Sequence, residues 1–335
     1  MISEFVDGFV PSLNKKKTLA GYAGRSRDGI RFMDLGLSVI RYRIAGHDSG
    51  SAIHNRKNKP VIVFQTDPPV VIEHYDYLVD LLSKDYIVIV FETPGFGFSV
   101  PSVRLDYSYT TSVSLTEQFL AKLNLGPVTL VAPCVLGFSG IGIAEKRPDL
   151  VNHLILSQVP NWTEMLKWKN ERDPKGLLSK PVISQILLKM LKKSRTPLWF
   201  KAALGKRDLF DHFNATAQQA YQHGATFNLA SGFQRLLIGE SPLPASITAK
   251  TLFLWGDKDR SHCNTCKDSS LEMIPHACSV HIPEAGHFPE LEESDLVMGH
   301  IEAFINSRSA AIAPGKTPIT ATPVKATETA AMKHV

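Results

Sequence analysis

The segment LVAPCVLGFSG, residues 130–140, decides the fold, because a buried strand leads through it into a tight turn and then a helix. Val128–Val131 is an apolar run typical of a short strand, and Gly137–Lys146 has helical spacing. Cys134 falls at the turn, beside a helix N-terminus whose free N–H groups and dipole stabilise an anion. The pattern fits either a nucleophilic thiol above a sheet edge or a small buried cysteine.

Similar strand and helix patterns alternate on both sides of this segment. Strand-like runs occur at residues 35–44, 60–64, 86–91, 153–156, 251–255 and 279–282, with helical patterns at 75–83 and 112–123. Near-continuous apolar runs are typical of parallel strands that helices cover on both faces. The alternation therefore predicts an α/β fold with a mostly parallel sheet.

The alternation stops between about residues 161 and 247, where no strand is evident. Val182–Lys193 has the pattern of an amphipathic helix, whose apolar side carries Ile183, Ile186, Leu187, Met190 and Leu191. We predict a helical insertion over the sheet, with this apolar side serving in packing, as a lid, or both. After about residue 309 the chain is rich in Ala, Thr, Pro and Lys, which predicts disorder.

Composition excludes several classes of protein. Hydrophobic residues make up 44% of the 335, and no run approaches the length of a membrane span. The net charge of +5 is a mild, scattered excess, so we expect a small-molecule substrate and no nucleic acid. The N-terminus lacks the apolar core of a secretory leader, and four cysteines make no disulfide framework, so we predict a cytoplasmic protein. Oligomeric state is left open.

The pair Cys263 and Cys266 forms a lone C-x-x-C next to His262. A zinc site normally requires a second such pair or histidines at matching spacing, and the sequence offers neither. We therefore predict surface thiols, no bound metal and no cofactor.

Two further loops follow strands and carry groups that could serve a nucleophile. In WGDKD, residues 255–259, Asp257 and Asp259 lie just past a strand end; in EAGHFPELEE, residues 284–293, His287 precedes a helix start. Ligands of open α/β sheets bind beyond the carboxyl ends of the strands. The chain order nucleophile, acid, histidine is that of a triad on such a sheet, although solvated turns and structural histidines are common.

These stretches together resemble the α/β-hydrolase fold, in the capped branch that includes haloalkane dehalogenases, epoxide hydrolases and many esterases. ETPGFGFS, residues 92–99, resembles the family's D-x-x-G-x-G-x-S segment with Glu in place of Asp, and EAGHFPELEE resembles its histidine loop. The resemblance implies an eight-stranded, mostly parallel sheet flanked by helices with an inserted cap. It divides the chain into an extension at 1–34, a core at 35–160 and 248–308, a cap at 161–247 and a tail at 309–335.

The resemblance also assigns roles to residues. It implies a triad of Cys134, Asp259 and His287, because WGDKD matches the family's W-G-x-x-D acid loop at Asp259. FQTDPP, residues 64–69, stands at the oxyanion loop, so the backbone N–H groups of Val135 and Asp67 are the expected oxyanion donors. The residues we expect to bind substrate are Thr66, Trp162 and Trp168. For Asp67 itself we favour a side chain turned away from the oxyanion, over a protonated carboxyl or a direct acid–base role.

The elbow departs from the family pattern, since G-x-S-x-G is replaced by Ala132-Pro133-Cys134-Val135-Leu136. Ser139 lies in a second, similar stretch just downstream. In the family a helix of about three turns separates the nucleophile from an x-P-D-x-V segment. Cys134 lies 14 residues before Pro148, which suits that helix, whereas Ser139 lies only 9 before it. The register therefore favours Cys134.

Three functions remain open. The first is hydrolysis of an ester, thioester or lactone of a small, largely apolar molecule through a covalent acyl-enzyme on Cys134. The second is a cyclase or lyase that uses the same site for proton transfer, and the third is a ligand-binding protein whose altered elbow has lost turnover. The family's dehalogenase and epoxide chemistries use a carboxylate at the elbow, which Cys134 does not supply.

Overall fold

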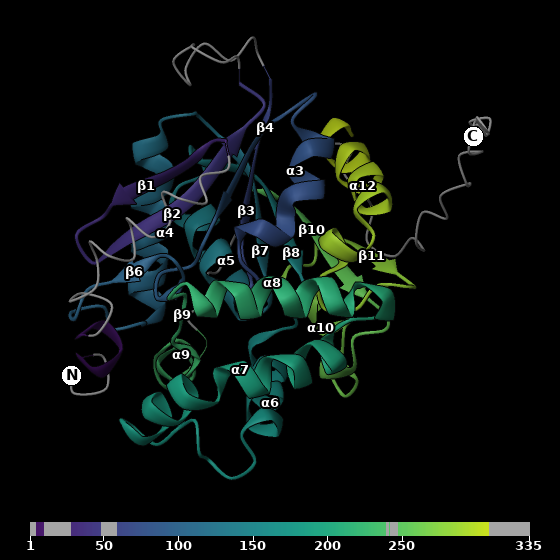
Figure 1. Ribbon diagram of the computed structural model, residues 1–335. Coiled ribbons are helices and arrows are strands. Elements are labelled where there is room, and N and C mark those ends of the chain that lie inside the picture. The colour runs from purple at the N-terminus through teal and green to yellow at the C-terminus, as the bar shows by residue number, and fades with distance from the viewer. Residues whose placement is uncertain (1–4, 10–27, 48–58, 239–240, 242–246, 308–335) are drawn as a thin grey trace, which may run out of the picture.

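The computed structural model describes residues 5–9, 28–47, 59–238, 241 and 247–307 (Figure 1). Its central sheet contains β1 (Ile30–Asp34), β2 (Ser38–Ala45), β3 (Val61–Gln65), β4 (Ile87–Phe91), β6 (Val100–Pro101), β7 (Val128–Pro133), β8 (Val151–Ser157), β10 (Lys250–Gly256) and β11 (Cys278–Ile282). The strand order is β1-β2-β4-β3-β7-β8-β10-β11, with β6 beside β2. Pairing is parallel from β4 onward and antiparallel at β1, β2 and β6, which confirms the predicted mostly parallel α/β sheet.

Helices cover both faces of the sheet (Figure 1). One face packs against α4 (Tyr109–Leu123) and α5 (Gly137–Lys146), and the other against α3 (Asp76–Leu82) and α12 (Ser294–Asn306). Strand β3 shows the reason: Val61 and Val63 belong to the first apolar cluster, Ile62 and Phe64 to the second. Successive strand side chains point to opposite faces, so a strand buried on both must be apolar throughout.

The first strand of the sheet lies earlier in the chain than expected. Residues 35–44 were predicted as one strand, but the chain turns at Leu35–Leu37 and forms a hairpin of β1 and β2. Gly36, at φ 78°, adopts the left-handed conformation that this turn needs, and its N–H donates to Asp34 Oδ1 at 2.8 Å. The predicted disordered tail, residues 309–335, lies outside the described residues.

The predicted insertion contains α6 (Trp162–Arg172), α7 (Ile183–Ala203), α8 (Phe210–Gln222) and α9 (Leu229–Arg235), which lie below the sheet in Figure 1. The prediction of no strand there is wrong in one detail. Strand β9 (Thr226–Phe227) pairs with β5 (Phe96–Gly97), joining this region to the loop after β4. Two residues are too few to show alternation in a sequence. The division of the chain into core and cap stays a prediction.

The apolar side of α7 faces outward, so it does not serve in packing, which was one of the two expected roles. Its exposed side chains are Ile183, Ile186, Leu187, Met190, Leu191 and Leu198. The opposite, more polar side is buried instead: Gln185 donates to Ser231 Oγ at 3.1 Å and to Gln234 Oε1 at 2.9 Å. The buried side of α7 thus makes hydrogen bonds to α9, which periodicity alone cannot reveal.

The ETPGFGFS turn after β4 is built around the carboxylate of Glu92, which accepts the N–H of Phe98 at 2.6 Å and that of Ile72 at 3.3 Å. A Cβ on Gly97 would lie 2.5 Å from the Glu92 carboxyl carbon, so only glycine fits there. Arg41, from β2, donates to Glu92 Oε1 at 2.9 Å and to Glu73 Oε1 at 2.5 Å. The turn therefore rests on a buried ionic cluster beneath the sheet edge.

The remaining described elements are short helices and single helical turns. The short helices α10 (Ser269–Met273) and α11 (Pro289–Glu292) follow β10 and β11 in the chain. Single turns of 3₁₀ helix are η1 (Ile72–Tyr75), η2 (Cys134–Leu136), η3 (Arg207–Leu209) and η4 (Arg260–His262). Of these, η2 and η4 lie at the carboxyl ends of strands, where the functional residues gather.

Candidate active site

Cys134 lies at the sharp turn between β7 and α5. Its φ of 45° is a left-handed conformation, which costs a non-glycine residue on the order of 1–3 kcal/mol and is concentrated at functional sites. The strand and helix still approach closely without flanking glycines, because Gly140 supplies the space: a Cβ there would lie 2.7 Å from Ala132 Cβ. The glycine that makes room for this contact thus lies within the helix rather than beside Cys134.

The alternative nucleophile, Ser139, lies within α5 and is fully buried. Its hydroxyl donates to Ser112 Oγ of α4 at 2.7 Å, so it links two helices. The structure therefore places Cys134 at the turn and Ser139 inside the helix, as the spacing to Pro148 predicted.

His287, in the loop after β11, is buried between two carboxylates. Its Nδ1 lies 2.6 Å from Asp259 Oδ2, and its Nε2 lies 2.9 Å from Asp67 Oδ2. Burial lowers the pKa of His287, but the charge and hydrogen bond of Asp259 and the hydrogen bond of Asp67 outweigh it, so this pKa lies well above its usual value. Both ring nitrogens thus face a carboxylate oxygen, an arrangement that favours the protonated ring.

The Asp67 side chain, expected to turn away from the oxyanion, has a partner that was not anticipated, namely His287. Asp67 lies two residues after the end of β3, and its carboxylate contacts the ring nitrogen of His287 that a thiol nucleophile would use. The physical reason is charge: a largely buried carboxylate is stabilised by a cationic partner, and His287 is that partner. Chain order could not reveal this contact, since the two residues lie 220 positions apart.

The Cys134 thiol is close to two histidines. Its Sγ lies 4.0 Å from His262 Nε2, and it also interacts with His287. Burial and the charge of Asp67 raise the pKa of Cys134, while His287 and the N–H of Val135 act in the opposite direction. The resting nucleophile is therefore a thiol rather than a thiolate.

His262 is a buried residue of the site, although in the sequence it stands out only as a neighbour of the C-x-x-C pair. Its ring stacks between Trp168, at a centroid distance of 5.2 Å, and His287, at 5.4 Å. Its Nδ1 lies 3.0 Å from Thr265 Oγ1, and burial lowers its pKa to about 3, so the ring is neutral. Its position three residues after Asp259, in the acid loop, was the available signal.

The other predicted residues are distributed around the site. Val135 begins the turn after Cys134, and Thr66 precedes Asp67 at the end of β3. Trp168 covers His262, whereas Trp162 packs edge-on against Phe138 at 5.0 Å, behind the turn. Trp199, from α7, meets the His287 ring edge-on at 5.3 Å. Within the described residues, the buried Thr66 Oγ1 and Trp168 Nε1 have no hydrogen-bond partner.

Glu292 holds the histidine loop in place. One carboxylate oxygen accepts the N–H groups of Gly286 at 3.0 Å and Phe288 at 3.2 Å, on either side of His287. The other accepts the N–H groups of Gly205 at 2.8 Å and Lys206 at 2.9 Å, just after α7. A single side chain thus ties the histidine loop to the backbone just after α7.

Among the described residues, Cys134, His262 and His287 also form a group that could hold a metal ion, with one ligand atom each, all within 4.8 Å of one another. The C-x-x-C cysteines, Cys263 and Cys266, are exposed free thiols.

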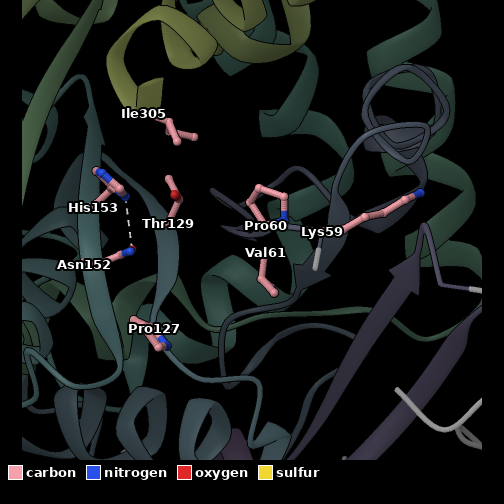
Figure 2. A pocket seen from close by; sticks show the side chains of 8 residues that line it. All are labelled: Lys59, Pro60, Val61, Pro127, Thr129, Asn152, His153 and Ile305. Carbon is pink, nitrogen blue, oxygen red and sulfur yellow. Dashed lines mark hydrogen bonds between the residues drawn. The ribbon is translucent and has the colours of Figure 1, made fainter. Parts of the chain in front are cut away.

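A cavity of about 290 Å³ lies elsewhere, at the amino ends of β3, β7 and β8 (Figure 2). It is lined by Lys59, Pro60, Val61, Pro127, Thr129, Asn152, His153 and Ile305. Cys134 follows the carboxyl end of β7, so this cavity lies at the opposite edge of the sheet and takes no part in the site.

Comparisons with known proteins agree with this architecture. Epoxide hydrolase 1 of Caenorhabditis elegans is 20% identical over 269 residues, which cover 74% of this chain and 65% of that protein. Epoxide hydrolase 2 of the same organism is 23% identical over 233 residues, covering 62% and 63%. The chain thus spans just under two thirds of the length of these curated relatives.

The crystal structure of epoxide hydrolase A from Mycobacterium thermoresistibile superposes with a TM-score of 0.65 at 15% identity, covering 82% of this chain and 97% of that one. At that identity the likeness shows the fold alone. Residues 69–299, more than half of the chain, match the family model described as "Alpha/beta hydrolase family". The chain therefore belongs to the alpha/beta hydrolase family.

Proposed function

We propose that the protein hydrolyses an ester, thioester or lactone of a small, largely apolar molecule through a covalent acyl-enzyme on Cys134. The observation that supports this most strongly is the left-handed turn at Cys134, beside the buried His287–Asp259 pair. A nucleophile, a histidine within reach and a carboxylate that orients the histidine are the parts that such chemistry requires.

The first step must free Nε2 of His287, which is bonded to Asp67 at rest. At 2.9 Å the proton can pass directly from Nε2 to the Asp67 carboxylate. His287 then accepts the thiol proton, and the thiolate of Cys134 attacks the acyl carbon. Because Asp67 is then a neutral acid, it no longer repels the oxyanion, to which the N–H groups of Val135 and Asp67 donate.

The intermediate then collapses to the acyl-enzyme. His287 gives its proton to the leaving alcohol, thiol or hydroxyl, and the acyl group stays on Sγ. A water molecule enters, His287 accepts its proton, and the hydroxide attacks the thioester carbon. The acid leaves and Cys134 regains its proton from His287. Asp67 then returns its proton to Nε2 of His287, which restores the resting site. The unpaired Thr66 Oγ1 and Trp168 Nε1 are two donors that a bound substrate's oxygens would satisfy.

A second candidate is proton transfer by Asp67 and His287 in a lyase or cyclase reaction, with Cys134 not forming a bond. The contact between Asp67 and His287 favours it, since it pairs a carboxylate and an imidazole as an acid and a base. The curated relatives are epoxide hydrolases by name, so epoxides belong among the compounds tested.

The test is a panel of activated esters, thioesters, lactones and epoxides, with mass spectrometry of the peptides that contain Cys134 and Asp67. The proposal expects acid product together with an acyl adduct on Cys134. Conversion with no adduct on Cys134, or an adduct on Asp67 alone, would contradict it. Binding without conversion of any compound would favour a ligand-binding role.

Substituting Asp67→Asn separates the two candidates. The change removes the carboxylate that holds the Nε2 proton, while keeping the backbone N–H and the side-chain shape. We expect acyl cleavage to be unchanged or faster, measured as kcat/KM on the best substrate of the panel. A loss of about 100-fold or more, within the range for general acid–base catalysis, would show that Asp67 itself acts as an acid or base and would favour the second candidate.

A further inference from the structure

Three metal-binding atoms meet at the site from three separate loops, and a carboxylate lies beside one of them. Sγ of Cys134 lies 4.0 Å from His262 Nε2, and one nitrogen of His287 lies within 4.8 Å of both. Because Nδ1 of His287 is bonded to Asp259, the nitrogen that faces this group is Nε2, and Asp67 Oδ2 lies 2.9 Å from it. The acyl mechanism has no role for His262 and uses the carboxylate of Asp67 only to take up the Nε2 proton.

We propose that Cys134 Sγ, His262 Nε2 and His287 Nε2 bind Zn²⁺. The carboxylate of Asp67, which contacts Nε2 of His287, moves in as the fourth ligand. The proposal does not depend on the proposed hydrolysis. It differs from the expectation of no metal, which rested on the C-x-x-C spacing. The ligands here follow four different strands, so no short spacing in the sequence marks them.

The charges of the ligands balance those of the ion. A thiolate at Cys134 and the carboxylate of Asp67 supply two negative charges, and the two histidines bind as neutral rings. The ion displaces the thiol proton and the Nε2 proton of His287. A complex with no net charge is what a buried position favours, and all four residues are buried.

The outer nitrogens of both histidines are already held as in known metal sites. Metal-ligating histidines usually donate the other ring N–H to a carboxylate or another oxygen. Here Nδ1 of His287 donates to Asp259 Oδ2 at 2.6 Å, and Nδ1 of His262 lies 3.0 Å from Thr265 Oγ1. Asp259 in turn accepts the N–H of Ser261 at 2.8 Å. Both rings are therefore fixed with Nε2 directed inward.

The ligand types select the ion. Zinc bonds of about 2.3 Å to sulfur and about 2.0–2.1 Å to nitrogen, at tetrahedral angles, bring ligand atoms about 3.4–3.6 Å apart. The 4.0 Å between Sγ and His262 Nε2 thus needs only a small inward movement. Calcium and magnesium prefer oxygen ligands, so a set with one sulfur and two nitrogens disfavours them. Bound zinc would occupy the nucleophile and block acyl transfer until a chelator removed it.

The experiment measures metal binding directly, with no substrate present. The chelator-treated full-length protein is titrated with Zn²⁺ against a chromophoric chelator, and with Co²⁺, whose spectrum reports thiolate ligation and tetrahedral geometry. We expect a single tight equivalent of Zn²⁺ and a thiolate-to-cobalt band. Both should persist in Cys263→Ser/Cys266→Ser, which removes the exposed thiols, and the band should vanish in Cys134→Ser.

His262→Phe keeps an aromatic ring between Trp168 and His287 but removes one ligand. We expect it to weaken zinc binding by more than about 100-fold, since loss of outer-sphere partners alone costs about 10–100-fold. The matched control is His281→Phe, an exposed histidine of β11 bonded to Asp257, which should bind zinc as the unaltered protein does.

Unchanged affinity in His262→Phe, or zinc binding lost only with Cys263 and Cys266, would overturn the proposal. If Cys134→Ser does not fold, the zinc affinity of His262→Phe still tests the proposal. A protein that cleaves esters but binds no zinc would leave the proposed function intact and reject the metal site. A protein that binds zinc but cleaves no ester would keep the metal site and reject the proposed function.

A second surface carries an independent inference. The exposed stripe on α7 consists of Ile183, Ile186, Leu187, Met190, Leu191 and Leu198. Its first five members recur every three or four residues along one side of the helix, and Leu198 lies two turns further on. Contiguous exposed apolar patches of this kind mark binding surfaces. The short helix at residues 5–9 is tied to α7 by an ion pair between Asp7 and Lys189 at 3.4 Å, and it exposes Phe5 and Phe9.

The charges on α7 are all of one sign. The helix contains Lys189, Lys192, Lys193, Arg195 and Lys201 and no acidic residue. Lys175 and Lys180, just before it, are exposed, as are Lys193 and Arg195. Like charges disfavour the pairing of this face with a second copy of itself. An apolar stripe bordered by cations is instead typical of helices that lie on anionic lipid surfaces.

We infer that this face of α7 docks on an anionic lipid bilayer. The binding is peripheral, since no helix in the described ranges is long and apolar enough to cross a membrane. The same helix places Trp199 against His287, so docking would bring the candidate active site next to the bilayer. This inference goes beyond the proposed hydrolysis and holds whether or not the substrate is a lipid.

The experiment is cosedimentation of the full-length protein with phosphatidylcholine vesicles that do or do not contain phosphatidylserine. We expect binding to the anionic vesicles that weakens as salt rises. Ile186→Gln/Met190→Gln should lower the binding constant at least about tenfold. The matched control Leu296→Gln, at an exposed leucine of α12, should not. No binding to anionic vesicles at low salt, or a dimer in solution that Ile186→Gln/Met190→Gln dissociates, would overturn the inference.

Discussion

Replacing Cys134 or His287 by alanine is expected to lower acyl-ester cleavage by at least about 10³-fold each, while the double variant is little worse than either single one. The reason is that thiol and imidazole act as one unit, so removal of either partner leaves the other without a function. The measurement is kcat/KM for the three variants on the best acyl substrate, with circular dichroism to show that each is folded.

Ser139→Ala is the matched control, because Ser139 occupies the competing position in the sequence but lies inside α5. It loses the hydrogen bond to Ser112 and should retain most of its activity. Activity that survives Cys134→Ala but is lost in Ser139→Ala would contradict the assignment of the elbow. Additive losses in the double variant would contradict the idea that Cys134 and His287 act together.

Arg41→Met is expected to lower the free energy of unfolding by about 3–5 kcal/mol, the usual cost of removing one partner from a buried ion pair. Arg41 is fully buried, and it pairs with Glu92 at 2.9 Å and with Glu73 at 2.5 Å. Burial raises the pKa of Glu92 to about 7 even with Arg41 beside it, so its charge is poorly tolerated without that cation. Denaturant titration measures the loss.

Two further variants show whether uncompensated charge is the cause. Arg43→Met, two residues along β2, removes a guanidinium that pairs with the more exposed Asp76 and Asp80, and should cost clearly less. Adding Glu92→Gln to Arg41→Met should recover part of the lost stability, because it removes a buried charge while keeping the hydrogen-bonding shape. A double variant less stable than Arg41→Met would contradict this explanation.

Local sequence patterns predicted most of the sheet. Strands β3, β4, β7, β8 and β10 were predicted within two residues at each end, because strands buried on both faces must be apolar at nearly every position. Helix α5 was predicted with its observed bounds. The hairpin of β1 and β2 was missed, since the polar edge strand β1 lacks that pattern.

The sequence could predict some features of the candidate site but not others. Cys134, Asp259 and His287 each follow a strand end, and parallel strands bring their carboxyl ends to one edge of a sheet, so the sequence could bring these three together. It could not show which atom faces which. The contact of Asp67 with His287 Nε2 and the placement of His262 near Cys134 depend on loops 128 to 220 residues apart.

The sequence by itself thus determined the layered α/β architecture and the register that puts Cys134 rather than Ser139 at the turn. Both follow from short-range periodicity and from spacing along one helix. Only the tertiary structure decided that Asp67 pairs with His287, that His262 completes a cluster of metal-binding atoms, and that the apolar side of α7 faces outward. The physical reason is that burial and charge in the assembled fold select side-chain partners across loops. Local sequence patterns do not contain that information.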